Sequence, residues 1–471
     1  MITLLTSLKS NMTSVSVMQQ RPQPKLILFT MPSLIALALS VLLSPALFAK
    51  TQGVLAQTQV AQTQVIHAGK LLAVPGKAPL AQQTLVIKDG RITHVEAGFR
   101  PVSHYVTASE QAQLIDLSSR FVMPGLMDMH VHLQSELGPN NDRDTVKLSN
   151  EDLAMQSVFF AKKTLLAGFT TVRDLLSEPE QIYALRDGIN KGWIDGPRII
   201  AAAGVSVTGG HLDADGMAHK LLEIKSIKTR CDGPYECRKV TRKAIKYGAD
   251  LIKIASTGGV LSDTNTGTGQ QMTQDELKEI VDTAHSLGKK VASHAHAKAG
   301  IDAALMAGVD SIEHGSYADK GTIKLFKKTG AYLVPTLLAG ATVVEMANST
   351  DFMSPAVRAK AIRVGADMQH NFKAAYEAGV NIAFGTDSGV SRHGTNAQEA
   401  ILMHQAGMSN SDILTSATVN GADLIGMGDS LGTLEVGKIA DIIALEMNPL
   451  EQIEALLDVA FVMKQGKIYK Q

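Results

Sequence analysis

The sequence has few cysteines, few aromatic residues and no net charge. Only two of its 471 residues are cysteines, which excludes a disulfide-stapled fold and a cysteine-rich zinc site. Aromatic residues make up 4% of the chain and Trp193 is the single tryptophan, so the chain has few side chains on which bases or sugars could stack. The 45 basic and 45 acidic side chains cancel, which argues against a nucleic acid or an anionic membrane as the main partner. With 45% hydrophobic residues the chain can bury a sizeable core, and its fourteen histidines are the most suggestive feature.

The amino terminus has the order of a secretory signal peptide. Residues 1–25 contain basic but no acidic side chains, an apolar run follows that is densest over 34–43, and small residues come next. Cleavage is expected after Ala56, with Ala49 as a second candidate, and the chain is then exported to the periplasm or secreted. The alternative is an uncleaved membrane anchor, but a proline interrupts the apolar run and a membrane span needs about 20 apolar residues.

If the chain is exported, its two cysteines lie in an oxidising compartment, where they can form a disulfide. Cys231 and Cys237 lie in the segment CDGPYEC, close enough to close a small loop in an oxidising compartment. A local disulfide and two free thiols are equally compatible with the sequence.

Between two β-rich ends, the chain alternates short apolar runs with helical stretches such as 273–287 and 354–378. Eight such strand–helix units over roughly 300 residues predict an α/β fold, a (β/α)8 TIM barrel. The expected strands are 122–133, 169–174, 198–204, 250–256, 290–297, 310–315, 331–336 and 381–387.

The β-rich ends are expected to meet in one small composite β-sandwich, because neither end has enough strands to be stable alone. The domains predicted from these patterns are a signal peptide and leader over 1–56, the N-terminal part of the sandwich over 57–123, the barrel over 124–425, and the C-terminal part of the sandwich over 426–471.

Ionisable residues stand at the carboxyl ends of five predicted strands, where the chemistry of a (β/α)8 barrel lies. Singly, each has an ordinary structural explanation, such as a core histidine, a paired lysine or a helix-capping aspartate. Together at one barrel end they point to a divalent-metal site, since imidazole and carboxylate suit zinc and related ions. His130 and His132, two apart on one strand, lie on the same face. The residues concerned are His130, His132, Lys253, His294, His296, His314 and Asp387.

The motif PGLMDMHVH (124–132) resembles the metal-binding opening of the amidohydrolase superfamily. The resemblance extends over about 65–470, and its nearest branch contains Xaa-Pro dipeptidases, imidazolonepropionase-like proteins and ochratoxin-hydrolysing amidases. The other motifs that carry it are GFTTVRDL (168–175), TGGH (208–211), DLIKIASTGG (250–259), SHAHA (293–297), SIEHG (311–315), GTDSG (385–389), HGTNAQEA (393–400) and LGTLEVGKIADI (431–442).

This resemblance implies two divalent metal ions, usually zinc, bridged by a lysine that carbon dioxide has carbamylated. A buried lysine with a lowered pKa can be neutral and react with carbon dioxide, so the chemistry is reasonable. The implied ligands are His130, His132 and Asp387 for the first metal, His294 and His314 for the second, and the Lys253 carbamate between them.

Three further residues are expected to meet the substrate. His296 is assigned to substrate because relatives place a tyrosine at this position, and His211 could polarise the scissile carbonyl or hold the substrate. Arg392 could pair with a substrate carboxylate. The alternatives are a loop histidine without contacts for His211 and a solvated surface arginine for Arg392. Arg173 and Asp174 are expected to pair with each other in a structural role.

The expected function is metal-dependent hydrolysis of the amide bond of a dipeptide or N-acyl amino acid, ochratoxin-type amides included. The specificity would be of carboxypeptidase type, and a metal-bridging hydroxide would attack while Asp387 transfers its proton. A single-metal deaminase or cyclic-amide hydrolase is the first alternative, disfavoured by Lys253 and by the absence of a glutamate shortly after His294. A non-catalytic binding or scaffold protein is the second, and it would be expected to have lost ligands. The expected partner is a small peptide or amide, without nucleic acid or stable membrane contact after signal removal, and a homo-oligomer is expected.

Overall fold

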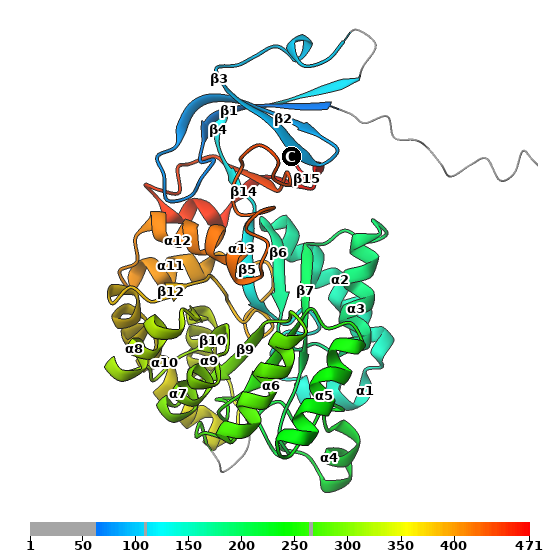
Figure 1. Cartoon of the computed structure of the whole chain (residues 1–471), viewed down its shortest axis with the longest axis vertical. Coiled ribbons are helices and arrows are strands. Elements are labelled where there is room, and N and C mark those ends of the chain that lie inside the picture. The colour runs from blue at the N-terminus through cyan, green and yellow to red at the C-terminus, as the bar shows by residue number, and fades with distance from the viewer. Residues whose placement is uncertain (1–62, 108–110, 263–266) are drawn as a thin grey trace, which may run out of the picture. The chain divides into compact units, whose positions relative to one another are not determined.

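The computed structural model describes residues 63–107, 111–262 and 267–471 (Figure 1). The predicted signal peptide and leader over 1–56 lie outside these residues, so that prediction stands as it was made. None of the helices in the described ranges combines the length and the apolar character that crossing a membrane requires.

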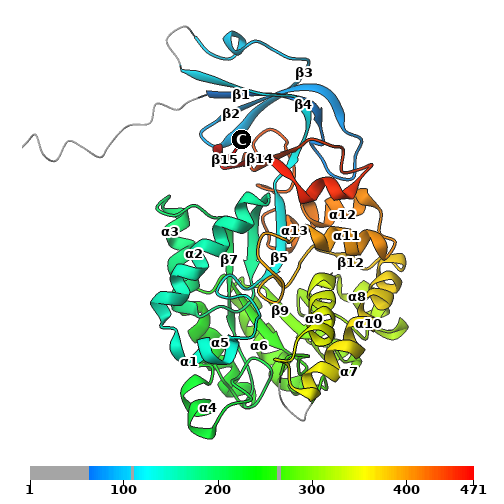
Figure 2. The same ribbon diagram turned by 180° about the vertical axis from the view of Figure 1, so that it is seen from behind.

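The central part of the chain forms the predicted barrel. Eight strands pair in parallel in chain order, and helices follow them around the outside (Figures 1 and 2). Backbone hydrogen bonds join the first strand and the residue after it to the segment that follows the last strand, from Met129 N to Phe384 O at 2.8 Å and from His132 N to Ser388 O at 2.6 Å. The strands are β5 (Leu126–Val131), β6 (Phe169–Asp174), β7 (Arg198–Gly204), β8 (Leu251–Ala255), β9 (Val291–Ala295), β10 (Ser311–His314), β11 (Tyr332–Val334) and β12 (Asn381–Ile382).

Side-chain caps mark the start of several helices. Thr273 and Glu276 form a reciprocal capping box at the start of α6, and the Ser354 side chain caps α10, as expected from the two helical stretches. The helices are α1 (Asn141–Lys147), α2 (Asn150–Leu166), α3 (Pro179–Asn190), α4 (His219–Lys225), α5 (Pro234–Lys246), α6 (Gln274–Ser286), α7 (Lys298–Ala307), α8 (Lys320–Thr329), α9 (Leu337–Ser349), α10 (Pro355–Glu377), α11 (Gln398–Gln405), α12 (Asn410–Ser416) and α13 (Val419–Leu424).

Strands from both ends of the chain join in one seven-stranded sheet, in the order β15-β14-β13-β4-β1-β2-β3. Their apolar side chains form one core, in which Ile66 and Leu85 pack in the same cluster as Ile442 and Phe461. The expectation that the two ends build one β module is therefore confirmed. The strands are β1 (Thr63–Leu71), β2 (Leu80–Lys88), β3 (Arg91–Ala97), β4 (Ala112–Pro124), β13 (Ile442–Leu445), β14 (Val459–Lys464) and β15 (Lys467–Lys470).

The run over 122–133, expected as one strand, belongs to two sheets. β4 ends at Pro124 in the composite sheet, and β5 begins at Leu126 in the barrel. Gly125 lies between them, where a Cβ atom would stand 2.3 Å from Oγ1 of Thr170. Only glycine allows the chain to pass this close to the barrel wall.

Buried polar contacts connect the composite sheet to the start of β7. Arg198 lies 2.6 Å from Oδ2 of Asp441, and the Lys464 ammonium donates to the carbonyl oxygen of Gly196 at 2.5 Å. Lys464 and Asp441 are both buried. These contacts fix the module to the strand ends opposite the candidate site.

Candidate active site

The first group of metal-ligating atoms joins the two ends of the barrel sheet. His130 and His132 come from β5, and Asp387 follows β12. Asp387 Oδ1 lies 3.4 Å from His130 Nε2 and 2.9 Å from His132 Nε2. All three residues offer ligand atoms within 4.8 Å of one another, so they can hold one cation.

A second group lies at the ends of β9 and β10. His294, His296 and His314 also offer ligand atoms within 4.8 Å of one another. The ring centroids of His130 and His314 are 5.2 Å apart, which places the two groups side by side. His296, expected to meet substrate, therefore stands among the expected metal ligands, and its Nδ1 lies 2.7 Å from Ser316 Oγ.

Two of the expected ligands have backbones in the left-handed region. His314 has φ 72° and Asp387 has φ 58°, values that non-glycine residues rarely adopt. Asp387 N donates to His130 O at 2.7 Å, which helps to hold the turn. Strained backbone of this kind is found where surrounding structure fixes a functional side chain.

Lys253 of β8 lies between the elements that carry the two groups. Its side chain is 2% exposed, and Nζ has no hydrogen-bond partner among the described residues. Burial lowers the pKa of Lys253 to about 8, which increases the neutral fraction that can react with carbon dioxide. A buried amine without a partner is costly, and conversion to a metal-bound carbamate would remove that cost. The donor set therefore fits the expected bridged pair.

Three of the four expected histidine ligands are held as neutral imidazoles, the form that binds a metal ion. Burial lowers the pKa of His130 to about 4 and holds the pKa values of His294 and His314 well below the ordinary value. Burial acts in the same direction on His132, but its hydrogen bond to Asp387 raises the pKa overall. A proton and a metal ion would thus compete for this imidazole.

Several imidazoles are oriented through Nδ1. His130 Nδ1 lies 3.0 Å from Glu313 Oε2, and His132 Nδ1 donates to Leu176 O at 3.2 Å. His314 Nδ1 lies 2.7 Å from Oγ1 of Thr336, which itself donates to a backbone carbonyl. Each contact fixes the ring and leaves Nε2 for a metal.

Glu313 and Arg173 form a buried pair that the sequence analysis missed. Arg173 contacts Glu313 Oε1 at 2.8 Å and also donates to Met129 O, while Asp174 accepts from Leu133 N. The expected pairing of Arg173 with Asp174 is wrong, because neighbours on a strand point to opposite faces. Burial opposes ionisation of Glu313, but the Arg173 charge and the His130 hydrogen bond lower its pKa to about 2.

His211, on the loop after β7, reaches the site. Its ring centroid is 4.2 Å from that of His294, and its Nδ1 lies 2.6 Å from Ser262 Oγ. Burial lowers the pKa of His211 to about 4. The alternative of a loop histidine without contacts is excluded.

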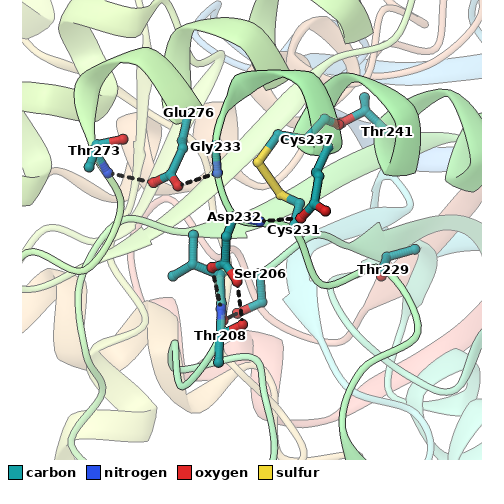
Figure 3. The surroundings of a disulfide bond; sticks show 12 residues. Ser206, Thr208, Thr229, Cys231, Asp232, Gly233, Cys237, Thr241, Thr273 and Glu276 are labelled. Atoms are coloured by element: carbon teal, nitrogen blue, oxygen red, sulfur yellow. Dashed lines mark hydrogen bonds between the residues drawn. A yellow bond between two sulfur atoms is a disulfide. The ribbon is translucent and has the colours of Figure 1, made fainter.

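A disulfide joins Cys231 and Cys237 near Ser206 and Thr208, at the start of this loop (Figure 3). Cys231 N donates to Ser206 O at 2.8 Å. The adjacent Asp232 accepts from the backbone N and Oγ1 of Thr208, at 3.1 and 2.6 Å, in the TGGH segment that ends in His211. The disulfide loop therefore holds the base of the loop that carries His211.

Arg392 does not join the site: its side chain is exposed and does not line the cavity.

Two buried acidic residues to which the sequence assigned no role accept hydrogen bonds from segments next to the site. Asp128 accepts from Thr386 Oγ1 and from Asn396, and burial raises its pKa to about 6. Glu399 accepts from the first two backbone N–H groups of α9.

A cavity of about 280 Å³ opens over the two groups. The polar part of its wall consists of the seven strand-end residues and His211. The rest of the wall is apolar and comes from loops after β6, β7, β8 and β12 and from α9 and α10.

Comparisons with known proteins agree with this architecture. The chain is 31% identical over 441 residues to ochratoxinase of Aspergillus niger, covering 88% of each chain. The crystal structure of an Xaa-Pro dipeptidase with bound methionine in the active site matches with a TM-score of 0.81 and 39% identity, over 87% of this chain and 100% of that one. A prolidase complexed with n-methylphosphonate-l-proline matches with a TM-score of 0.78 and 30% identity, over the same shares. A model of the amidohydrolase family matches residues 121–469, and the chain belongs to this family.

Proposed function

We propose that this protein is a two-metal amidohydrolase that cleaves the amide bond of dipeptides or N-acyl amino acids. The observation that carries the proposal is that two groups of ligand atoms and the partnerless Lys253 amine line one cavity. A single-metal enzyme would need only one such group.

The ligand assignment follows the donor sets. His130, His132 and Asp387 would hold one ion and His294 and His314 the other, with Lys253 as a carbamate between them. When bound, two divalent ions, zinc being the expected metal, lower the pKa of water and polarise a carbonyl.

Asp387 is placed to move the proton. Burial opposes its ionisation, but His130 and His132 lower its pKa below the ordinary value, so it is a carboxylate at neutral pH. In hydrolysis, the oxygen of water bonds to the amide carbon and the C–N bond breaks. Asp387 accepts the proton of the attacking water and delivers it to the leaving nitrogen.

His211 is placed to stabilise the carbonyl oxygen as charge develops on it. Ser262 Oγ can donate to Nδ1 of His211, which leaves Nε2–H free to donate to the substrate carbonyl. His296 remains the proposed partner of another substrate group, since it lines the same cavity. Arg392 stays a proposed partner of a substrate carboxylate only for a substrate that extends beyond the cavity.

The relatives support this substrate class. One related structure holds methionine in its active site and another holds an N-substituted proline analogue. Both ligands are amino acids or close to them, as expected for enzymes that act on amides of amino acids.

The test combines metal analysis with a substrate survey. Protein stripped with a chelator and reloaded with zinc should contain two ions per chain. It should also release free amino acids from a library of dipeptides and N-acyl amino acids, followed by mass spectrometry. One ion in fully active protein would favour the single-metal deaminase or cyclic-amide hydrolase, and reloaded protein that cleaves no amide would refute the substrate class.

We also propose that the protein is exported to the periplasm or secreted. The disulfide between Cys231 and Cys237 supports this, because disulfides persist mainly in oxidising compartments. Cell fractionation and N-terminal sequencing of the mature protein test it: the mature chain should begin after Ala56 or Ala49. A cytosolic protein with an intact N-terminus would contradict export.

A further inference from the structure

The cavity has two chemically different parts. Imidazole, amine and carboxylate groups line the part that holds the candidate ligands. The remainder of the lining is apolar, and α9 and α10 contribute Ala339, Gly340 and Val343 from one helix and Val364, Gly365 and Met368 from the other. This surface is called the α9–α10 wall below.

The α9–α10 wall is held in place by close helix packing. A Cβ atom on Gly340 would stand 2.8 Å from Met368 Sδ, and one on Gly365 would stand 2.3 Å from a methyl carbon of Val344. The two glycines therefore bring the helices together and leave room in the cavity. Packing this tight allows little relaxation, so the wall presents a fixed apolar shape.

The wall offers no charge to a substrate side group. Among the described residues that line the cavity, the aspartate and lysine side chains are Asp387 and Lys253, both assigned to metal binding. Arg392 lies outside. A charged side group pressed against this wall would lose its hydration without gaining a partner, whereas an apolar group would gain by leaving water.

We propose that the α9–α10 wall is a specificity subsite that selects amides with a bulky apolar side group, such as that of leucine, methionine or phenylalanine, next to the scissile bond. Val343, Val364 and Met368 are the residues that contact this group, and Ala339 limits its size. The inference rests on the proposed function and specifies its substrate class.

The first experiment measures kcat/KM on two substrate series. One series varies the C-terminal residue through glycine, alanine, leucine, phenylalanine, lysine and glutamate with the acyl part constant. The other varies the acyl residue in the same way. One series should favour leucine or phenylalanine over lysine and glutamate by roughly 100-fold, and that series identifies the group that contacts the wall.

Two variants locate the preference on the wall. Val343→Thr puts a hydroxyl on the wall at nearly constant volume and should lower kcat/KM for leucine and phenylalanine by about tenfold, with little change for glycine. Ala339→Val narrows the cavity and should penalise phenylalanine more than alanine. Val357→Thr on α10 is the matched control, because it makes the same change at a buried residue that does not line the cavity.

The inference and the proposed function fail in different ways. Cleavage that favours lysine or glutamate, or variants that affect all side groups equally, would overturn the inference and leave amide hydrolysis intact. If no amide is cleaved, the proposed function fails. The wall is then tested by thermal shift of the zinc-loaded protein with free amino acids, where phenylalanine and leucine should stabilise more than lysine or glutamate, and equal shifts would overturn the inference.

Discussion

Glu313 Oε2 lies 3.0 Å from Nδ1 of His130, so a fully buried carboxylate orients one of the expected metal ligands. The other carboxylate oxygen accepts from Arg173 and from Ser311 Oγ. Arg173 is itself 2% exposed, so Glu313 also supplies its counter-charge. Glu313 therefore both orients His130 and neutralises the buried charge of Arg173.

Replacing Glu313 with glutamine should damage both roles. Glu313→Gln keeps the shape but leaves the Arg173 charge unpaired, which should cost about 3–5 kcal/mol of stability. The loss of the carboxylate behind His130 should weaken metal binding by roughly 10- to 100-fold. Chelator competition and urea unfolding measure the two effects, with Glu345→Gln on the exposed side of α9 as control. Unchanged zinc retention would show that Glu313 does not orient a ligand.

Lys253→Ala tests the proposed bridging role of Lys253. We expect the variant to lose metal and activity, and a small carboxylic acid such as acetate or propionate to restore part of both by occupying the space of the carbamate. Metal content by mass spectrometry and turnover at increasing acid concentration are the measurements. Lys464→Met replaces a buried lysine elsewhere in the chain and should keep its metal. A fully active Lys253→Ala protein without added acid would rule out the bridge.

Asp387→Asn should separate metal binding from proton transfer. The amide keeps an oxygen that can act as a ligand, but it cannot accept a proton at neutral pH. We expect metal to be retained and kcat to fall by about 10²–10⁴-fold, the usual contribution of a general acid–base group. Metal analysis and steady-state kinetics on one preparation give both values. Wild-type turnover would remove Asp387 from the proton pathway.

The sequence was sufficient to predict the barrel and the residues at its mouth, because short apolar runs with polar ends repeat at regular spacing. β6 and β7 have the expected limits. The division of 122–133 into two strands was missed, although Pro124 and Gly125 are turn-forming residues within the run. What sets the position of Gly125 is its close approach to Thr170, a contact that the local sequence does not reveal.

The supporting residues were missed for a different reason. Glu313 contacts residues 140 and 183 positions away, so no local pattern reveals its partners. Strand alternation would also place Glu313 and His314 on opposite faces. The left-handed backbone of His314 breaks this alternation, and such a conformation leaves no signal in the residue type.

Removing the disulfide should affect stability and the His211 loop together. In a chain-entropy model, Cys231→Ala combined with Cys237→Ala costs about 2 kcal/mol for a loop of this size. KM should rise as well, because Asp232 beside Cys231 holds Thr208 at the base of the loop. Asp232→Ala should reproduce the change in KM with the disulfide intact. Urea unfolding and kinetics test both, and a cysteine variant with wild-type KM would show that the disulfide does not hold the loop.

Lys464 should make the attachment of the composite sheet pH-dependent. Burial lowers its pKa to about 8, whereas the unfolded chain should titrate near 10.4. Between these values the unfolded state binds more protons, so the free energy of unfolding should rise with pH, by up to roughly 3 kcal/mol. The added free energy of unfolding is fully present above pH 10.4 and is lost as the pH falls through 8. Lys464→Met should abolish the rise. The free energy of unfolding of the wild type minus that of the variant isolates the effect of Lys464, because the other titrating groups contribute equally to both proteins. Parallel stability curves from pH 8 to 10.4 would show that Lys464 is not held in a desolvated site against Gly196.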